Sequence, residues 1–303
     1  MAQSPSSTIP PHPLDDPHSY LSISYHHSLP FVTVIALNRP KKINAINAQM
    51  WKEIGDAFGK IGTIGDGCRC ILMIGCGKGF CGGIDVTDEK FFSGLVGNSG
   101  DDDTSQDVAR KSLSFRSQIS QMQSAFTAVE ECPVPVVAAI HGACIGAGID
   151  LTCCADVRVC SPDAKFSIRE VRLGLAADVG TLQRFPKLVG FGSYVRELCL
   201  TGDDFNADDA LRIGFVSRIS KSNDSLIEIA NDICLRISRN SPVAATITKA
   251  SLNFSRDHSV SEGLEHIALQ NSTALMSEDL VKSFLMTGGT APHFEPLRSH
   301  SRL

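Results

Sequence analysis

The chain has 303 residues, of which 43% are hydrophobic and 20% charged, and its formal net charge is −5. Such a composition is typical of a globular protein with a large core, and the negative balance argues against a broad nucleic-acid-binding surface. No apolar run reaches the roughly 20 residues of a membrane-spanning helix. We therefore expect neither a membrane nor a nucleic acid among its partners.

The proline-rich residues 1–20 are expected to form a flexible tail. The residues that follow alternate between strand-length apolar pieces and segments with helical periodicity. We predict strands at Leu21–Ser24, Phe31–Leu37, Cys70–Cys76, Val136–Ile140, Asp156–Cys160 and Lys165–Ile168. We predict helices at Asn44–Lys60, at about 104–131 and at Ala147–Cys154, with a loop at 93–103 and Asp103 or Thr104 as a helix cap.

From Thr181 onward the pattern is helical almost without interruption. We predict helices at Gly190–Leu200, Ala207–Ile213, Leu226–Arg239, Pro242–Asn253, Glu262–Ala274 and Glu278–Leu285. Alternating strands and helices followed by helices alone predict an α/β sheet core with a helical C-terminal region.

Eleven cysteines are spread over the chain without the spacing of a metal site or a disulfide framework. Their number is odd, Cys153-Cys154 lies in an apolar stretch, and no Cys-x-x-Cys pair occurs. We expect reduced, mostly buried thiols and no bound metal. The alternative, a secreted disulfide protein, conflicts with the position of the first basic residue at Arg39, because a signal peptide begins with positive charge.

Two glycine-rich turns, each ending at an acidic residue, follow predicted strands. The first runs from Gly77 to Asp85 and the second from His141 to Asp150. Glycine lets the backbone approach a ligand, and amides freed there can stabilise a developing negative oxygen. We expect one donor near Ile84 and another where a helix opens at Gly146-Ala147-Gly148. The alternatives are a surface loop for the first turn and a packing turn with a capping aspartate for the second.

A third segment, residues 166–184, adds two acidic residues. Glu170 closes a predicted strand, and Asp178 lies in the otherwise apolar stretch from Leu173 to Val179. Burial of a carboxylate there would raise its pKa and let it hold a proton near neutral pH. The alternative for Asp178 is an N-cap for a helix that begins near Gly180, and one residue can serve both purposes.

The sequence finishes with Ser301-Arg302-Leu303. Ser-Lys-Leu at a free C-terminus is a peroxisomal address, and Arg302 keeps the positive charge of the middle position. The loop-like residues 292–300 would leave the tripeptide accessible. We expect a peroxisomal location and a peroxisomal import receptor as a partner, with chance occurrence of the three residues as the alternative.

With these motifs in view, the chain resembles the crotonase (enoyl-CoA hydratase/isomerase) superfamily over about residues 20–285. The matching marks are Asn38-Arg39-Pro40 with Asn44-Ala45, Gly79–Asp85, His141–Leu151 and Gly180–Pro186. The resemblance implies an α/β fold: a crotonase-like spiral of ββα units with a helical C-terminal trimerisation region. It also implies homotrimers that stack into homohexamers. The expected divisions are a tail at 1–20, the spiral core at 21–205, the helical region at 206–286 and a tail with the targeting tripeptide at 287–303.

Within the superfamily, Asp150, Glu170 and Asp178 make the chain most similar to the Δ3,5-Δ2,4-dienoyl-CoA isomerases. The resemblance implies that the amides of Ile84 and Ala147 hold the thioester oxygen and that Glu170 lies beside the acyl C2. Asp178 stands where typical hydratases carry glycine, and Asp150 where they carry their other catalytic glutamate. The expected activity converts 3,5-dienoyl-CoA to 2,4-dienoyl-CoA in β-oxidation of unsaturated fatty acids. Glu170 would remove the C2 proton and Asp178 would protonate C6, by way of an oxyanion-stabilised dienolate. Asp150 would tune the other two carboxylates or hold the acid/base network.

The matching positions imply contacts with CoA at two places. These residues are Lys41, Lys42 and Ile43, and the strip Gly83, Ile84, Asp85 and Val86. CoA is part of the substrate, so no separate cofactor is expected. The alternative for Lys41-Lys42 is a solvated loop pair. Residues 287–293 lack the lysines that family members often use to reach CoA phosphates of a neighbouring subunit, so that contact is not expected.

Two other functions stay open at this point. A 2-enoyl-CoA hydratase needs two carboxylates that hold one water, usually glutamates, and the shorter Asp150 and the extra Asp178 speak against it. A non-catalytic or RNA-binding member of the fold would lack the carboxylates or carry a basic helix, and this chain has the carboxylates and a net charge of −5.

Overall fold

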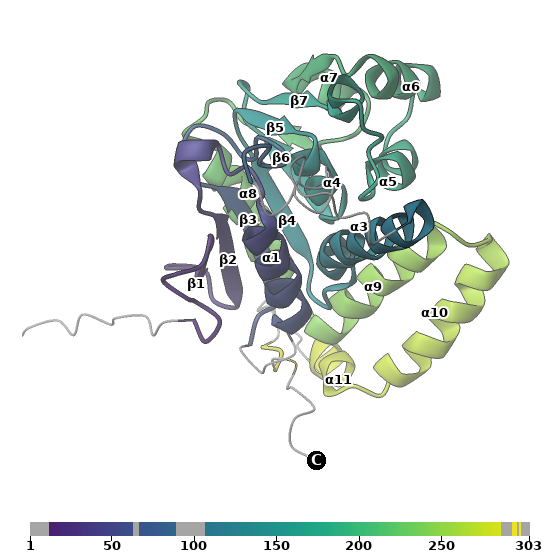
Figure 1. Cartoon of the computed structure of the whole chain (residues 1–303). Coiled ribbons are helices and arrows are strands. Elements are labelled where there is room, and N and C mark those ends of the chain that lie inside the picture. The colour runs from purple at the N-terminus through teal and green to yellow at the C-terminus, as the bar shows by residue number, and fades with distance from the viewer. Residues whose placement is uncertain (1–11, 63–66, 89–106, 286–292, 296, 298–303) are drawn as a thin grey trace, which may run out of the picture.

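The computed structural model describes residues 12–62, 67–88, 107–285, 293–295 and 297 (Figure 1). A six-stranded sheet in the order β1-β2-β3-β4-β6-β9 forms its centre. The strands are β1 (Leu21–Tyr25), β2 (Val32–Leu37), β3 (Cys70–Gly75), β4 (Val136–Ile140), β6 (Val157–Cys160) and β9 (Arg218–Ile219). All neighbours run parallel except β1, which pairs antiparallel with β2.

Both faces of the sheet are covered, which explains the continuous apolar runs of its central strands. Cys70 and Leu72 of β3 pack with residues of α8 (Leu226–Ser238) on one face. Ile71 and Met73, which alternate with them, pack on the other face with residues of α1 (Ala48–Lys60) and α3 (Val108–Glu131). All five residues of β4 are buried.

A second sheet of three short strands stands beside the first. It has the order β5-β7-β8 and is made of β5 (Ala143–Ile145), β7 (Lys165–Ser167) and β8 (Asp204–Asn206). The sequence pattern did not predict β5, β8 or β9, because segments of two or three residues carry too few side chains to show a period of two. Strand residues thus continue beyond position 205, the expected end of the core.

Local capping explains where the first helix begins. The predicted helix ends at Lys60, as expected, but its predicted start at Asn44 was wrong, since Ile43 and Asn44 have the left-handed φ values of 49° and 54°. The α1 helix starts after Asn47, whose side chain accepts a hydrogen bond from the Met50 amide. For α3, Asp107 is the cap. The predicted loop 93–103 and the proposed caps Asp103 and Thr104 lie outside the described residues, as do residues 1–11 and 298–303 of the predicted tails.

The described residues from Thr181 to Leu285 are mostly helical, as predicted, apart from β8 and β9. The helices are α5 (Thr181–Leu188), α6 (Gly192–Thr201), α7 (Ala207–Arg212), α8, α9 (Pro242–Ser255), α10 (Val260–Ala274) and α11 (Glu278–Leu285). Figure 1 shows α9 and α10 side by side at one flank of the molecule, with α10 on the outside.

Residues 12–20, expected to be part of the tail, contact the sheet edge: Leu14 packs on the core and Asp15 accepts a hydrogen bond from the Ile23 amide.

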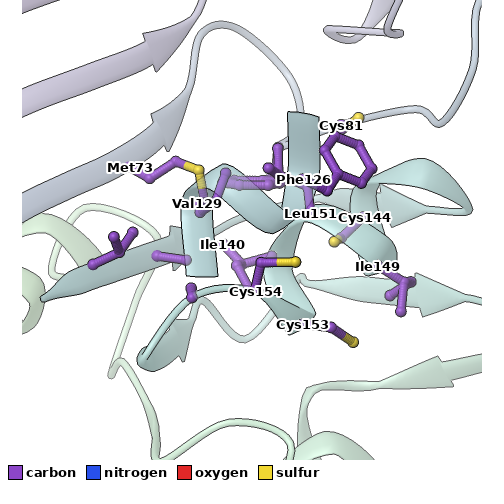
Figure 2. Close-up of a cluster of buried hydrophobic side chains, with 14 of the residues drawn as sticks. Met73, Cys81, Phe126, Val129, Ile140, Cys144, Ile149, Leu151, Cys153 and Cys154 are labelled. Carbon is purple, nitrogen blue, oxygen red and sulfur yellow. The ribbon is translucent and has the colours of Figure 1, made fainter. Parts of the chain in front are cut away.

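An apolar cluster supports the short helix α4 (Ala147–Cys153). Figure 2 shows Met73 of β3, Phe126 of α3, Ile140 of β4 and Leu151 of α4 within one buried cluster.

All eleven cysteines are free thiols, and nine of them are buried, as predicted. Within the described residues, no helix has both the length and the apolar character needed to cross a membrane.

Candidate active site

The two predicted glycine turns lie side by side. Cys81 and Cys144 form a parallel bridge in which the Ile145 amide donates to the Cys81 carbonyl at 2.9 Å. Beyond the bridge, Gly83 and Gly146 have φ values of 98° and 52°, a region that favours glycine. A Cβ atom on Gly83 would lie 3.2 Å from the Ile145 carbonyl oxygen, and one on Gly146 would lie 3.2 Å from Oε1 of Glu170. Both positions therefore favour glycine, by their backbone conformation and by the closeness of their neighbours.

Two backbone amides are free at this junction, at the positions that the sequence predicted. Around Ile84, the Gly83 carbonyl and the Asp85 amide are both bonded to Ile46, which leaves the Ile84 amide facing the other way. Ala147 is the first residue of α4, so it has no partner within the helix. Within the described part of the chain, neither amide donates a hydrogen bond to a backbone or side-chain acceptor. Both residues line one cavity of about 250 Å³.

The three predicted carboxylates, Asp150, Glu170 and Asp178, line the same cavity. The rest of its wall is largely apolar and comes from the two glycine turns, α1, α3 and the segment 173–179. The other lining residues are Trp51, Gly82, Gly83, Ile84, Val86, Ile119, Met122, Ile145, Gly146, Ala147, Arg169, Leu173, Leu175, Ala176, Ala177 and Val179. An apolar cavity with a few converging polar groups is the usual form of a small-molecule site.

A larger, more open groove of about 600 Å³ runs between α1 and α3 on the other side of Trp51 and Met122. Asp56 is its only carboxylate among the described residues. We therefore place the chemistry in the smaller cavity.

Asp150 is fully buried on α4. Its Oδ1 accepts a hydrogen bond from the Thr181 amide at 2.6 Å, and its buried Oδ2 has no partner among the described residues. Burial raises the pKa of Asp150 to about 7, helped by the negative charges of Glu170 and Asp178 and opposed by the bond from Thr181. The alternative that Asp150 caps its own helix is wrong, since it binds the first amide of α5 instead.

Glu170 begins a short 3-10 helix, η2 (Glu170–Leu173), three residues after β7 has ended at Ser167. The sequence pattern had indicated that Glu170 closes the strand, and this prediction was wrong. Its Oε1 lies 3.2 Å from the place that a Cβ on Gly146 would take, so the carboxylate adjoins the second glycine turn. Burial raises the pKa of Glu170, and the charge of Asp178 raises it further.

Asp178 is the most exposed of the three carboxylates. Loss of solvent in the cavity raises its pKa. The interpretation of Asp178 as a helix cap is wrong, because α5 begins at Thr181 with Gly180 at the cap position and has no side-chain cap. The charges of these carboxylates act on one another. Neighbouring acids whose pKa values are raised can exchange protons with a substrate near neutral pH.

The residues expected to contact CoA are divided between a surface loop and the cavity wall. Lys41, Lys42 and Ile43 are exposed at the 3-10 helix η1 (Pro40–Lys42), and the Lys42 Nζ donates to Thr87 at 3.1 Å. Gly83, Ile84 and Val86 line the cavity, whereas Asp85 does not.

Asp85 is engaged within the protein. It is buried, and its carboxylate accepts hydrogen bonds from Thr87 and from the Arg39 Nη2, the latter at 2.8 Å. Although burial opposes the shift, these bonds lower the pKa of Asp85 to about 2. This ion pair joins the Asn38-Arg39-Pro40 turn to the chain that carries Ile84.

Several supporting residues were given no role by the sequence. Asn44 is buried, and its Nδ2 lies within hydrogen-bond distance of the Cys76, Gly79 and Phe80 carbonyls, which ties it to the first glycine turn. Gln123 donates to the Asp178 carbonyl. Trp51 is buried and also lines the cavity. A ring nitrogen of His141 lies 2.9 Å from the Gly77 carbonyl oxygen, which ties the second turn to the first.

No group of three His, Cys, Asp or Glu side chains in the described part of the chain is arranged to hold a metal ion. The expectation of a site without a metal or a separate cofactor stays a prediction.

Comparison with known proteins adds three findings. A family model described as enoyl-CoA hydratase/isomerase matches residues 30–294. The chain is 44% identical over 266 residues to a mouse protein named Delta(3,5)-Delta(2,4)-dienoyl-CoA isomerase, mitochondrial, which covers 88% of this chain and 79% of the relative. It is 41% identical over 246 residues to an Arabidopsis thaliana protein of the same name, peroxisomal, which covers 81% and 86%.

The fold has counterparts among solved structures. An enoyl-CoA hydratase from Bacillus anthracis superposes with a TM-score of 0.78 at 23% identity, covering 91% of this chain and 99% of that one. This match confirms the expected fold class.

Proposed function

Since the chain belongs to the enoyl-CoA hydratase/isomerase family, we propose that it converts 3,5-dienoyl-CoA to 2,4-dienoyl-CoA in the β-oxidation of unsaturated fatty acids. One observation carries the proposal: Asp150, Glu170 and Asp178 line one apolar cavity beside the free amides of Ile84 and Ala147. The relatives at 44% and 41% identity that are named as such isomerases support it.

The reaction moves one proton from C2 to C6. In our proposal Glu170, which adjoins the second glycine turn, removes the C2 proton as a carboxylate. The electron pair passes into the conjugated chain, and negative charge collects on the thioester oxygen between the Ile84 and Ala147 amides. Asp178, protonated in the cavity, then delivers a proton to C6 and closes the 2,4-diene. To complete the cycle, Glu170 releases the proton that it took from C2 and Asp178 takes up a proton, with the more exposed Asp178 in contact with solvent.

Asp150 has a tuning role in this scheme. Its Oδ1 is engaged by Thr181, so it holds the N-terminus of α5, just beyond Asp178, rather than a substrate atom. The charges of Glu170 and Asp178 raise the pKa of Asp150, so its protonation is linked to theirs.

A 2-enoyl-CoA hydratase is the rival that the same cavity permits. The measurement that separates the two offers 3,5-dienoyl-CoA and 2-enoyl-CoA to the purified protein and follows absorbance of the conjugated product. We expect turnover of the dienoyl thioester. Turnover of 2-enoyl-CoA alone would refute the proposal.

The second arm of this experiment uses Asp178→Asn. Each positioned proton-transfer group contributes about 10²–10⁴ in rate, so turnover should fall at least about 10²-fold with CoA binding nearly intact. Near-normal activity would remove Asp178 from the mechanism.

We further propose that Lys41, Lys42 and Ile43 and the strip Gly83, Ile84, Asp85 and Val86 form the binding site for CoA. The exposure of the two lysines and the place of the strip at the cavity support this. For Asp85 the contact would come from the backbone, since its carboxylate is bound to Arg39. Replacing both lysines with alanine should raise KM and leave kcat unchanged; an unchanged KM would exclude them.

For location, we propose the peroxisome with its import receptor as partner. The Arabidopsis relative is named peroxisomal, while the mouse relative is named mitochondrial. Ser301, Arg302 and Leu303, which lie outside the described residues, support the first. A fluorescent protein that ends in the last residues of this chain should enter peroxisomes and lose that location when the tripeptide is deleted. Mitochondrial import of the full chain would overturn the assignment.

A further inference from the structure

One face of α3 carries three polar side chains that all reach the segment 178–184. Gln123, Thr127 and Glu130 are spaced by four and three residues, which places them in a row on one side of the helix. The Gln123 Nε2 donates to the Asp178 carbonyl at 2.6 Å. Arg184 donates through Nη2 to the Thr127 hydroxyl at 3.0 Å and through Nε to the Glu130 carboxylate at 2.9 Å. The helix therefore contacts both ends of this segment.

Gly180 and Thr181, in the middle of the segment, lie between these contacts and the cavity that holds the three carboxylates. Gly180 has a φ of 136°, and a Cβ atom on it would overlap the guanidinium of Arg184. On the cavity side, Asp150 accepts the Thr181 amide at 2.6 Å. The backbone from Asp178 to Thr181 is thus held from two directions.

The row on α3 has its own buried support. Glu130 is buried and forms ion pairs with both Arg184 and Arg256, and its carbonyl accepts a hydrogen bond from Asn253 of α9. Although burial opposes the shift, hydrogen bonds from the two arginines lower the pKa of Glu130. An ionised Glu130 keeps Arg184 over Gly180, so the charge pair fixes the end of the segment that Gln123 does not reach.

We propose that Gln123 and Arg184 are positioning residues that fix the direction of the Asp178 carboxylate toward the acyl chain. The hydrogen bond to that carboxylate comes from the backbone of Asp178 itself, and among the described residues no side chain donates to it, so its direction depends on its backbone. A proton donor has to be held within about 0.5 Å and 10–20° of its productive geometry, and a misplacement of about 1 Å can reduce turnover about 10²-fold. The inference rests on the proposed isomerase function, in which Asp178 protonates C6.

Gln123→Met tests the inference, because methionine keeps the length of the side chain and removes the donor. We expect kcat for 3,5-dienoyl-CoA to fall about 10-fold, with KM within about twofold and an unchanged melting temperature. Gln121→Ala, an exposed change on the same helix, is the matched control and should leave kcat unchanged. Arg184→Lys keeps the charge but has fewer donors, and it should lower kcat in the same direction.

A double-mutant cycle separates positioning from general structural support. If Gln123 acts through Asp178, then Gln123→Met should cause no further loss of kcat in the Asp178→Asn background. A purely structural effect would multiply with the effect of Asp178→Asn, and that result would overturn the inference.

The pH dependence gives a second readout. A less confined Asp178 is better solvated, so its pKa should fall and the high-pH limb of kcat/KM should move to lower pH in Gln123→Met. An unmoved limb together with control-like kcat would overturn the inference while leaving the isomerase function intact. Absence of 3,5-dienoyl-CoA turnover in the wild-type protein would refute the proposed function itself and the inference with it.

Discussion

Asp150 is a carboxyl group whose burial should be visible in the stability of the whole chain. Its pKa is about 7 in the folded protein, whereas an unfolded aspartate titrates near 4. Below about pH 4 the folded and unfolded states both hold the proton on Asp150, so its ionisation does not affect stability. Between about pH 4 and about pH 7 only the folded state holds it, and stability falls by up to about 1.4 kcal/mol per pH unit as pH rises.

Asp150→Asn removes this titration and keeps an oxygen for the Thr181 amide. We expect the variant to gain stability relative to the wild type as pH rises from about 4 to about 7, with a constant difference above that range. Urea unfolding at several pH values measures the difference, and Asp56→Asn, an exposed carboxyl on α1, is the matched control. A pH-independent difference would show that Asp150 is ionised throughout.

Gly146 is a residue where a single methyl group should impair the site. Its φ of 52° disfavours any side chain, and a Cβ would stand 3.2 Å from Oε1 of Glu170. We expect Gly146→Ala to lower kcat about 10–100-fold, because it displaces the proposed base and the adjoining amide of Ala147.

Gly59→Ala is the control for this substitution. Gly59 lies in α1 with nothing within 4 Å of a Cβ, so alanine there should stabilise the helix by up to about 1 kcal/mol and leave kcat unchanged. Steady-state kinetics and urea unfolding of both variants check the pair. Normal kcat in Gly146→Ala would mean that the second turn does not form the oxyanion site.

At the scale of elements, the sequence predicted those helices and strands that are long enough to show a repeating pattern of apolar residues. Long amphipathic helices and buried strands were located within a few residues, because each repeats its pattern several times. The short strands β5, β8 and β9 were missed because they exist only through pairing with distant residues. Lys165–Ser167, for example, pairs with Ala143–Ile145 on one side and with Asp204–Asn206 on the other.

The same limit applies to the candidate site. Asp150, Glu170 and Asp178 could be chosen from sequence because charged side chains stood in apolar surroundings or matched a family pattern. Gln123 and Thr181 could not, because their contacts join a side chain to backbone atoms 55 and 31 residues away. No residue type marks such a contact in advance, since any residue offers the same backbone groups.

One buried lysine contributes to the attachment of α9 to the body. The Nζ of Lys249 pairs with Asp156 at 2.9 Å and donates to the Val134 carbonyl at 3.1 Å. We expect Lys249→Met to destabilise the protein by about 2–4 kcal/mol, because it leaves the partly buried Asp156 carboxylate without its cation and the Val134 carbonyl without this donor. Urea unfolding measures this, with the exposed Lys52→Met as control. A loss no larger than the control's would mean that Lys249 does not contribute to holding α9.

At the scale of the molecule, the outer helices present apolar side chains to solvent. Leu264, Leu269, Met276 and Phe284 of α10 and the residues after it are exposed by 63%, 72%, 86% and 78%. Large apolar side chains left exposed on outer helices can mark a site of association. The expected homotrimer or homohexamer would bury it, and the place of α10 on the outside of the molecule leaves it accessible to a second copy (Figure 1).

Leu264→Glu tests this arrangement at one position of α10. A charge placed in an apolar interface has to be desolvated without a partner, which costs several kcal/mol. We expect light scattering to give three or six times the mass of one chain for the wild type and a smaller assembly for the variant. Gln270→Glu adds the same charge at an exposed polar position of the helix and should leave the mass unchanged. Equal masses for all three proteins would place the interface on another face, and the apolar surface of α10 would then need a different partner.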